Sequence, residues 1–273
     1  MSAITFAAAQ LLRVLPRVGL SRAVGRLCER ELPPKLSKFI ANTYCRAYGV
    51  DMSEVEPCDG YASFDSFFTR PLRAGARTIS DDPVVSPADG ALSAVGPVDP
   101  GCRIFVKGQP YEVAELIGDA QDAVRYTGGQ FAVVYLSPRD YHRVHAPVDG
   151  KITALRGIPG DLFPVNAIGE RHVPRLLVRN NRVCIHIDTT DLGRVTVVMV
   201  GAMIVGKISI SVVPDPVIAP GLHPVEPPIL VRRGDEIGKF HLGSTAVLLF
   251  EPKVSVARQP GPVRYGQSLL KAT

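Results

Sequence analysis

The sequence predicts an α+β protein, with a helical N-terminal layer over residues 1–70 on a β-sandwich or barrel-like domain over residues 71–273. Helix-compatible patterns stop near residue 70, and short runs rich in β-branched residues begin near residue 80. The 25 glycines and 24 prolines are scattered between these runs, as expected for many short strands and turns. With 46% hydrophobic residues among 273, the chain is long enough to bury a core.

Prolines and positive charge mark the N-terminal layer. Pro16 and Pro33-Pro34 are positions where helices are expected to end or kink. Residues 1–48 carry eight Lys or Arg against two Glu, a net charge of +6, whereas the whole chain carries only +5. The basic excess therefore lies entirely in this layer.

The charged and apolar residues of this layer are spaced for two separate stripes on a helix, which suits a membrane surface. The cationic stripe consists of Arg22, Arg26 and Arg30, and the apolar stripe of Leu20, Val24 and Leu27. The apolar stretch 4–12 is too short to span a bilayer, because about 20 residues are needed. The first positive charge, Arg13, follows this stretch, so no secretory signal peptide is expected. The alternative is that these helices only cover the β-rich domain, with their arginines in solvent.

The β-rich region contains five clear strand patterns and one helical insertion. The insertion is Val113–Ala123. The strand patterns are bounded by glycines and prolines and are rich in β-branched residues; they cover residues 131–136, 183–187, 195–200, 208–213 and 246–250. Their spatial order is not fixed by this pattern.

The cysteines and the charge distribution argue against two classes of function. The five cysteines are odd in number and show no metal-type spacing, which favours a reducing compartment and no bound metal. The pI of about 9.0 invites a nucleic-acid partner. The basic residues, however, lie in amphipathic helices without interleaved aromatic residues, so no nucleic acid is expected.

The tripeptide Gly243-Ser244-Thr245 precedes an apolar strand pattern. A serine hydroxyl is a potential internal nucleophile, and the carbonyl of Gly243 carries no neighbouring side chain to obstruct attack. Two further segments supply an acid and a base: Asp89 in Pro87-Ala88-Asp89-Gly90, and the histidines of the segment 141–145. An acid, a histidine and a serine are then available as Asp89, His145 and Ser244. Taken alone, the tripeptide is also ordinary turn composition, and Asp89 an ordinary turn residue.

Together, several segments in this order resemble the phosphatidylserine decarboxylase family. They are Phe67-Phe68-Thr69-Arg70-Pro71-Leu72-Arg73, Pro87-Ala88-Asp89-Gly90, Lys107-Gly108-Gln109-Pro110-Tyr111, Tyr141-His142-Arg143-Val144-His145, Gly160-Asp161-Leu162-Phe163-Pro164-Val165-Asn166, Val200-Gly201-Ala202 with Val205-Gly206, and Leu242-Gly243-Ser244-Thr245. Two positions depart from the family pattern. The chain has Asn180-Asn181-Arg182 where the family usually has Asn-Glu-Arg, and it lacks the tryptophan often found after the Val-Gly segment.

The resemblance implies a proenzyme that cuts itself between Gly243 and Ser244, giving a large chain 1–243 and a small chain 244–273. Ser244 would become a covalent pyruvoyl cofactor, which forms a Schiff base with phosphatidylserine and releases CO2 to leave phosphatidylethanolamine. His145 would be the general base for cutting and Asp89 would orient it. His142 is the second choice for contact with substrate. The resemblance also implies a homodimer, peripheral on the cytoplasmic side of the cell membrane.

Three rival functions remain open at this stage. A Ser-His-Asp hydrolase would use Ser244 without cutting the chain, although the G-x-S-x-G elbow is absent. A peripheral lipid-binding module would need only the basic helices. A pyruvoyl-dependent relative acting on another amino-acid head group is the third. An intact single chain would favour the first two.

Overall fold

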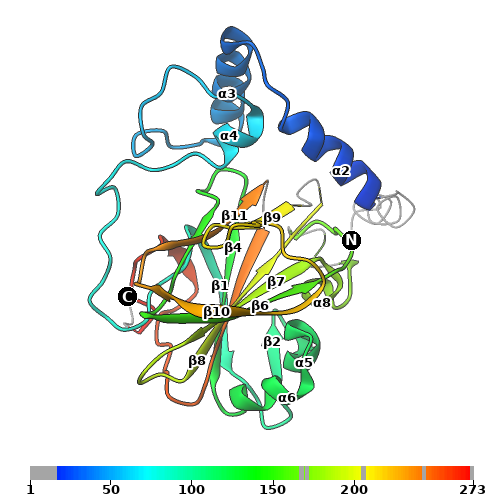
Figure 1. Ribbon diagram of the computed structural model, residues 1–273, viewed down its shortest axis with the longest axis vertical. Coiled ribbons are helices and arrows are strands. Elements are labelled where there is room, and N and C mark those ends of the chain that lie inside the picture. The colour runs from blue at the N-terminus through cyan, green and yellow to red at the C-terminus, as the bar shows by residue number, and fades with distance from the viewer. Residues whose placement is uncertain (1–16, 166–168, 170–171, 204–206, 242–243, 271–273) are drawn as a thin grey trace.

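The computed structural model describes residues 17–165, 169, 172–203, 207–241 and 244–270. Within these ranges the protein is α+β, as the sequence predicts. Figure 1 shows the N-terminal helices, in blue and cyan, at the top of the view, the β-sheets below them, and further short helices, in green, at the bottom. The division predicted at residue 70 stays a prediction.

Three helices form the N-terminal layer: α2 (Arg17–Cys28), α3 (Pro34–Tyr48) and α4 (Phe64–Phe68). Pro34 occupies the first turn of α3, where its missing N–H costs nothing. Gly49 ends α3 in the left-handed conformation, at φ 67°. Ser63 and Ser66 begin α4 with a reciprocal capping box. The predicted break at Pro33-Pro34 therefore lies at the start of α3, and the one at Pro16 lies outside the described residues.

The predicted cationic stripe is shorter than expected. Helix α2 ends at Cys28, so Arg30 lies beyond the helix and cannot continue the stripe. The side chains of Leu20 and Arg22 lie outside the description, as do residues 1–16. In the part of the chain that is described, every helix is too short or too polar to cross a bilayer.

The larger sheet has eight antiparallel strands. In spatial order they are β10 (Gly221–Val231), β6 (Gly150–Ile158), β7 (Arg182–Asp188), β8 (Arg194–Val200), β12 (Ser244–Phe250), β4 (Gln130–Leu136), β1 (Gly90–Pro97) and β13 (Gly261–Val263). Its two ends, β10 and β13, are not paired with each other among the described strands. The sheet is therefore open, and the barrel-like alternative is wrong.

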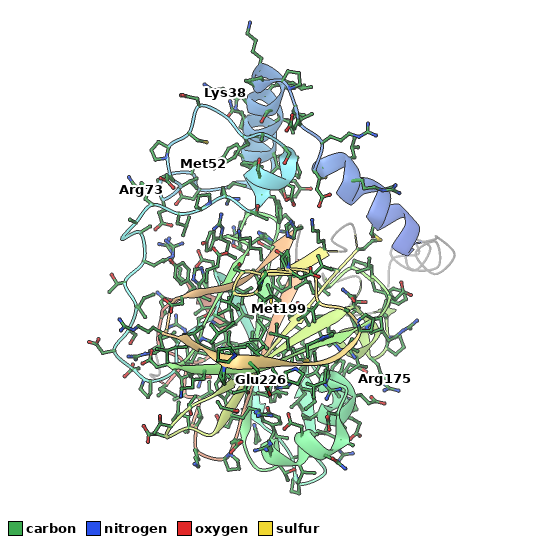
Figure 2. All side chains as sticks on the ribbon, viewed as in Figure 1. Lys38, Met52, Arg73, Arg175, Met199 and Glu226 are labelled. Carbon is green, nitrogen blue, oxygen red and sulfur yellow. The ribbon has the colours of Figure 1, made fainter. Side chains whose placement is uncertain are left out.

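A three-stranded sheet packs against one face of the larger sheet. Its order is β5 (Arg143–His145), β11 (Glu236–His241) and β9 (Lys207–Ile210). The main core joins the two, with Val144, Ile210 and Phe240 from the small sheet against Met199 and Leu248 from the large one. Figure 2 labels Met199 near the centre of the molecule. The sandwich alternative describes this region well.

The other face of the large sheet is covered by a hairpin and short helices. The elements are β2 (Arg103–Val106), β3 (Gln109–Glu112), α5 (Val113–Ile117), α6 (Ala120–Ala123), η1 (Val124–Tyr126) and α8 (Leu176–Arg179). A second core cluster lies beneath them, including Ile104, Leu116 and Val198. The predicted helix Val113–Ala123 is present but divided, because Gly118 adopts a left-handed conformation at φ 70°.

Candidate active site

The start of β12 is the point where the chain passes from the small sheet to the large one. Strand β11 ends at His241, and β12 begins at Ser244 between β8 and β4. Ser244 is in register with Leu136, the last residue of β4. Gly243, whose carbonyl is the predicted point of attack, lies outside the described residues. The predicted cut therefore falls on the short connection between the two sheets.

Ser244 is completely buried, and its hydroxyl has no hydrogen-bond partner among the described residues. In a strand alternate side chains share a face, so Ser244 points to the same side as Leu248, toward the small sheet. An unsatisfied buried hydroxyl costs about 1–3 kcal/mol. Such a group in a native fold calls for a functional explanation. Among the described residues, the Ser244 hydroxyl therefore has no hydrogen-bonding role in the fold.

His145 lies in β5 with both ring nitrogens in contact with polar groups. Nδ1 is 2.7 Å from the carbonyl oxygen of Gly234, and Nε2 is 3.3 Å from the hydroxyl of Tyr141. Because a carbonyl only accepts, Nδ1 carries the proton and Nε2 is free to act as a base. Burial lowers the pKa of His145 from its ordinary value. The ring is therefore neutral at pH 7, as a general base must be.

Asp89 stands immediately before β1 and is held by two groups. The guanidinium of Arg77 forms an ion pair with its carboxylate, and the backbone N–H of Tyr265 donates to Oδ1 at 2.9 Å. The Tyr265 ring stacks on His145, with centroids 3.8 Å apart and planes 4° from parallel. Asp89 thus contacts the backbone of Tyr265, and His145 contacts its ring. Among the described residues no direct hydrogen bond joins Asp89 to His145.

His142 is fully buried beside the N-terminal layer. Its ring lies against Phe68, with centroids 4.0 Å apart, and its Nδ1 is 2.8 Å from the carbonyl oxygen of Asp140. Its Nε2 is buried without a partner in the described chain. Burial lowers the pKa of His142 to about 3. The backbone N–H of Phe240, four residues before Ser244, donates to the His142 carbonyl at 2.9 Å.

The positions of these groups follow from strand pairing. β12 pairs with β4, and β4 pairs with β1, so Asp89 lies about two strand spacings, roughly 10 Å, from Ser244. A Cβ on Gly90 would come within 2.2 Å of the Tyr135 carbonyl oxygen, so only glycine allows β1 and β4 to approach this closely.

His145 lies near Asp89, because its backbone N–H donates to the Pro87 carbonyl at 2.8 Å. Its register partner Glu236 begins β11, whereas Ser244 follows the other end of that strand. Among the described residues no direct hydrogen bond joins Asp89, His145 and Ser244.

Two cavities adjoin these residues. One, of about 390 Å³, lies on the face opposite Ser244 and is lined by Thr245, Tyr135, Tyr111 and Lys107. The other, of about 430 Å³, is lined by Asp89, Gly90 and Tyr141 together with several arginines. Both are large enough for a small polar head group.

Sequence reasoning missed the residues that position the predicted site. Tyr265 and Gly234 come from loops far along the chain from Asp89 and His145, and Arg77 lies 12 residues before Asp89. No local pattern marks any of the three. The Tyr-His-Arg-Val-His segment assigns no role to Tyr141. Its hydroxyl near His145 Nε2 is a signal that only the fold provides.

The segment that departs from the family pattern has a structural role. Asn180 is buried, and its amide binds the backbone of Phe163 and the carbonyl of Gly201. Arg182 is buried and donates to four backbone carbonyls. The departing residue, Asn181, lies between these two anchors and is only half-buried. The substitution thus leaves both anchors in place.

Comparison with known proteins agrees with this arrangement. The family model described as phosphatidylserine decarboxylase matches residues 64–271. A relative from Anaeromyxobacter sp. (strain K) is 42% identical over 270 residues, covering 94% of this chain and 95% of its own length. Relatives from Acinetobacter baylyi and Bordetella pertussis are 44% and 43% identical, covering 87% and 92% of this chain and 84% and 89% of their own. All three are named phosphatidylserine decarboxylase proenzyme.

The fold and these matches define a carbon–carbon lyase of the decarboxylase class. The chain belongs to the phosphatidylserine decarboxylase family. The resemblance seen in the sequence is thereby confirmed.

Proposed function

We propose that this chain is a phosphatidylserine decarboxylase proenzyme that cuts itself between Gly243 and Ser244. The observation that carries the proposal is the buried Ser244 hydroxyl, which has no hydrogen-bond partner in the described chain and belongs to the first residue of the central strand β12. The names of the relatives supply the substrate and the proenzyme state.

In the proposed cut, Nε2 of His145 receives the Ser244 proton while Oγ attacks the Gly243 carbonyl carbon. The C–N bond breaks, the proton goes to the nitrogen of Ser244, and an ester joins the two residues. Loss of the Ser244 α-proton then breaks the Cβ–Oγ bond and releases Gly243 as a carboxylate. Water replaces the nitrogen of the remaining dehydroalanine, and one ammonia leaves. Asp89 stabilises the charged histidine across Tyr265.

The residues present fit the pyruvoyl group that results. The group needs no separate binding site, because it is the remnant of Ser244 itself, whose buried hydroxyl is without a partner among the residues that the structure describes. When formed, it supplies a ketone that can take the substrate amine and accept the electron pair left as CO2 departs. His142 Nε2 and the Tyr141 hydroxyl are the nearby groups that can hold or return a proton. The buried surroundings exclude water from this step.

The N-terminal layer supports contact with an anionic membrane surface. On α3, Leu36 and Phe39 are 45% and 68% exposed, and Lys35 and Lys38 lie beside them in the helix. Exposed apolar residues rimmed by lysines suit the boundary between lipid head groups and acyl chains. Lys38 is labelled in Figure 2 on this helix, away from the sheets. We place the enzyme on the cytoplasmic side of the cell membrane, as a homodimer in keeping with the resemblance.

The intact mass of the denatured protein tests the proposal. The wild-type chain should separate into residues 1–243 and a small chain that is lighter, by one ammonia, than the peptide 244–273. A Ser244→Ala variant should stay uncut. The cut protein should then form phosphatidylethanolamine from phosphatidylserine vesicles. An active wild-type protein with a single uncut chain would overturn the mechanism and favour a Ser-His-Asp hydrolase.

A further inference from the structure

Arg70, just after α4, is a buried guanidinium with unsatisfied donors. The residue is 2% exposed, and its Nε and Nη1 have no hydrogen-bond acceptor among the described residues. Its guanidinium lies over the ring of Phe67, whose centroid is 5.4 Å from Cζ. Burial lowers the pKa of Arg70 from its ordinary value. A buried charge of this kind is normally paired, because leaving it alone costs several kcal/mol.

The cavity beside Arg70 contains other charges, and these have partners. The cavity is the one of about 430 Å³ near Asp89. Its carboxylates accept hydrogen bonds from described residues: Asp89 from Arg77 and the Tyr265 N–H, Glu54 from Arg77 and Arg264, Asp51 from the Ser53 N–H, and Asp140 from Ser137. Arg258 donates to backbone carbonyls, and Arg139 is largely exposed. The unmatched buried positive charge of this cavity is therefore Arg70.

The cavity is close to the predicted catalytic groups. Asp89, Gly90 and Tyr141 are part of its lining, and Tyr141 contacts His145. Phe68, two residues before Arg70, lies against His142. Gly90 is roughly 10 Å from Ser244 across two strand spacings. The span from the nitrogen to the phosphorus of a phosphoserine head group is four bonds, about 5 Å, and the arginine side chain covers much of the rest.

We propose that Arg70 binds the phosphodiester of the phospholipid head group in this cavity. This inference rests on the proposed function and names the anchoring residue for its substrate. Guanidinium groups recognise phosphate oxygens through charge-assisted hydrogen bonds. The alternative oxyanion, the serine carboxylate, is a poor partner, because an ion pair with the group that leaves as CO2 stabilises the ground state and slows the reaction. The phosphodiester keeps its charge throughout, so Arg70 binds substrate and product alike.

Binding is measured with water-soluble head groups on the full chain carrying Ser244→Ala, which keeps turnover out of the measurement. Glycerophosphoserine and glycerophosphoethanolamine should bind with Kd values within about threefold of each other. Free serine, which has the carboxylate without the phosphate, should not compete. Arg70→Met should weaken both ligands by at least roughly tenfold, the loss expected for one charge-assisted hydrogen bond. Arg70→Lys, which keeps the charge, should recover part of the affinity.

Two control variants distinguish a specific effect of Arg70 on binding from the effect of removing any positive charge. Arg139→Gln removes an exposed charge from the same cavity, and Lys107→Gln removes one from the lining of the other cavity. Both should bind within about twofold of the parent. Equal binding by Arg70→Met and the parent would overturn the proposal. So would Arg70-dependent binding of inorganic phosphate without binding of either diester, since that result indicates a free-phosphate site.

A second measurement needs no change at Arg70. Hydrogen exchange of the backbone at 67–72 in the Ser244→Ala chain should slow on addition of glycerophosphoserine and stay unchanged with serine. No change with either compound would also overturn the proposal. Because the chain is uncut in these experiments, failure of binding leaves self-cleavage and decarboxylation untouched. Conversely, an uncut wild-type chain would defeat the proposed function and leave the binding result standing.

Discussion

His241 Nδ1 lies 2.8 Å from one carboxylate oxygen of Asp65 and 3.0 Å from the other. Its Nε2 is 2.9 Å from the Ser209 hydroxyl on the neighbouring strand β9. Asp65 belongs to α4 and His241 is the last residue of β11, two positions before Gly243. This contact ties the N-terminal layer to the strand that leads into the proposed cut.

The contact should be energetically coupled. In a double-mutant cycle on the uncut Ser244→Ala chain, Asp65→Asn and His241→Gln should together destabilise by about 1 kcal/mol less than the sum of the single changes. Urea unfolding measures the three free energies. In the chain that keeps Ser244, either change should also slow self-cleavage, because the C-terminal end of β11, which leads into the cut, is then positioned less rigidly. Strict additivity in the cycle would show that the contact contributes nothing.

The buried His142 should make the fold sensitive to acid. Its folded pKa is about 3, against an ordinary value of 6.5, so below pH 6.5 the unfolded chain binds the proton more readily. Its contribution is therefore fully present above about pH 6.5 and is lost as the pH falls towards 3. By linkage, about 2 kcal/mol should be lost at pH 5.

Urea unfolding of the Ser244→Ala chain at pH 7 and pH 5 measures this loss, and His142→Gln is the comparison. The variant should lose about 2 kcal/mol less than the parent over the same interval. An equal loss in both would assign the acid sensitivity to other groups, among them His145 and His186, whose pKa values burial also lowers.

Gly90 and Gly49 offer a matched pair of substitutions. Alanine at position 90 would place Cβ 2.2 Å from a backbone oxygen, so we expect a loss of about 3 kcal/mol and a displaced Asp89. A Cβ at position 49 would have no atom within 4 Å. Alanine there should therefore cost only about 1–2 kcal/mol of stability, because its φ is +67°. Thermal unfolding of both variants gives the comparison. Similar losses would contradict the close approach of β1 and β4.

Tyr265 should act through its ring and backbone and not through its hydroxyl. Tyr265→Phe keeps the stack on His145 and the N–H that holds Asp89, so self-cleavage should proceed at close to the wild-type rate. Tyr265→Ala removes the stack, and cleavage should slow by roughly 5- to 30-fold, because about 1–2 kcal/mol of positioning is lost. Timed gels of freshly folded protein follow both. A Phe variant as slow as Ala would assign the role to the hydroxyl.

The exposed apolar residues of α3 should determine binding to membranes. Phe39→Ser should weaken sedimentation with vesicles containing phosphatidylserine by roughly tenfold, since one immersed aromatic contributes about 1.5–2 kcal/mol. Leu230→Ser on edge strand β10 is the control, because Leu230 is 69% exposed but far along the chain from the helical layer. Equal effects of both changes would count against docking through α3.

The sequence predicts best the strands that are buried on both faces. Residues 131–136, 183–187, 195–200 and 246–250 fall within β4, β7, β8 and β12, where burial on both sides demands continuous β-branched and apolar residues. The pattern at 208–213 overruns β9, because the chain turns after Ile210. The missed strands include β1, which is rich in small residues, and β6 and β11, in which charged residues and glycines interrupt the apolar ones. β10 contains three prolines. An edge strand tolerates them, because one of its sides forms no backbone hydrogen bonds with a neighbouring strand.

The sequence predicts which residues belong to the candidate site but not how they are arranged in space. Asp89, His145 and Ser244 carry recognisable chemistry in recognisable segments. Their relation depends on Tyr265, a loop residue 176 positions from the Asp89 that it binds, and no local pattern encodes such a contact. Burial is the other part that the sequence does not reveal. Only the three-dimensional structure shows that Ser244 Oγ and two nitrogens of Arg70 are buried without a partner among the described residues.

The central place of β12 has a consequence for the life of the mature enzyme. Once the proposed cut is made, the small fragment remains woven between β8 and β4 and supplies part of both cores, so dilution should not release it. Unfolding is a different matter, since reassembly then requires an encounter between two separate polypeptides and its rate depends on concentration. The uncut precursor folds as a single molecule. After the cut, an unfolded enzyme can no longer refold in that unimolecular way.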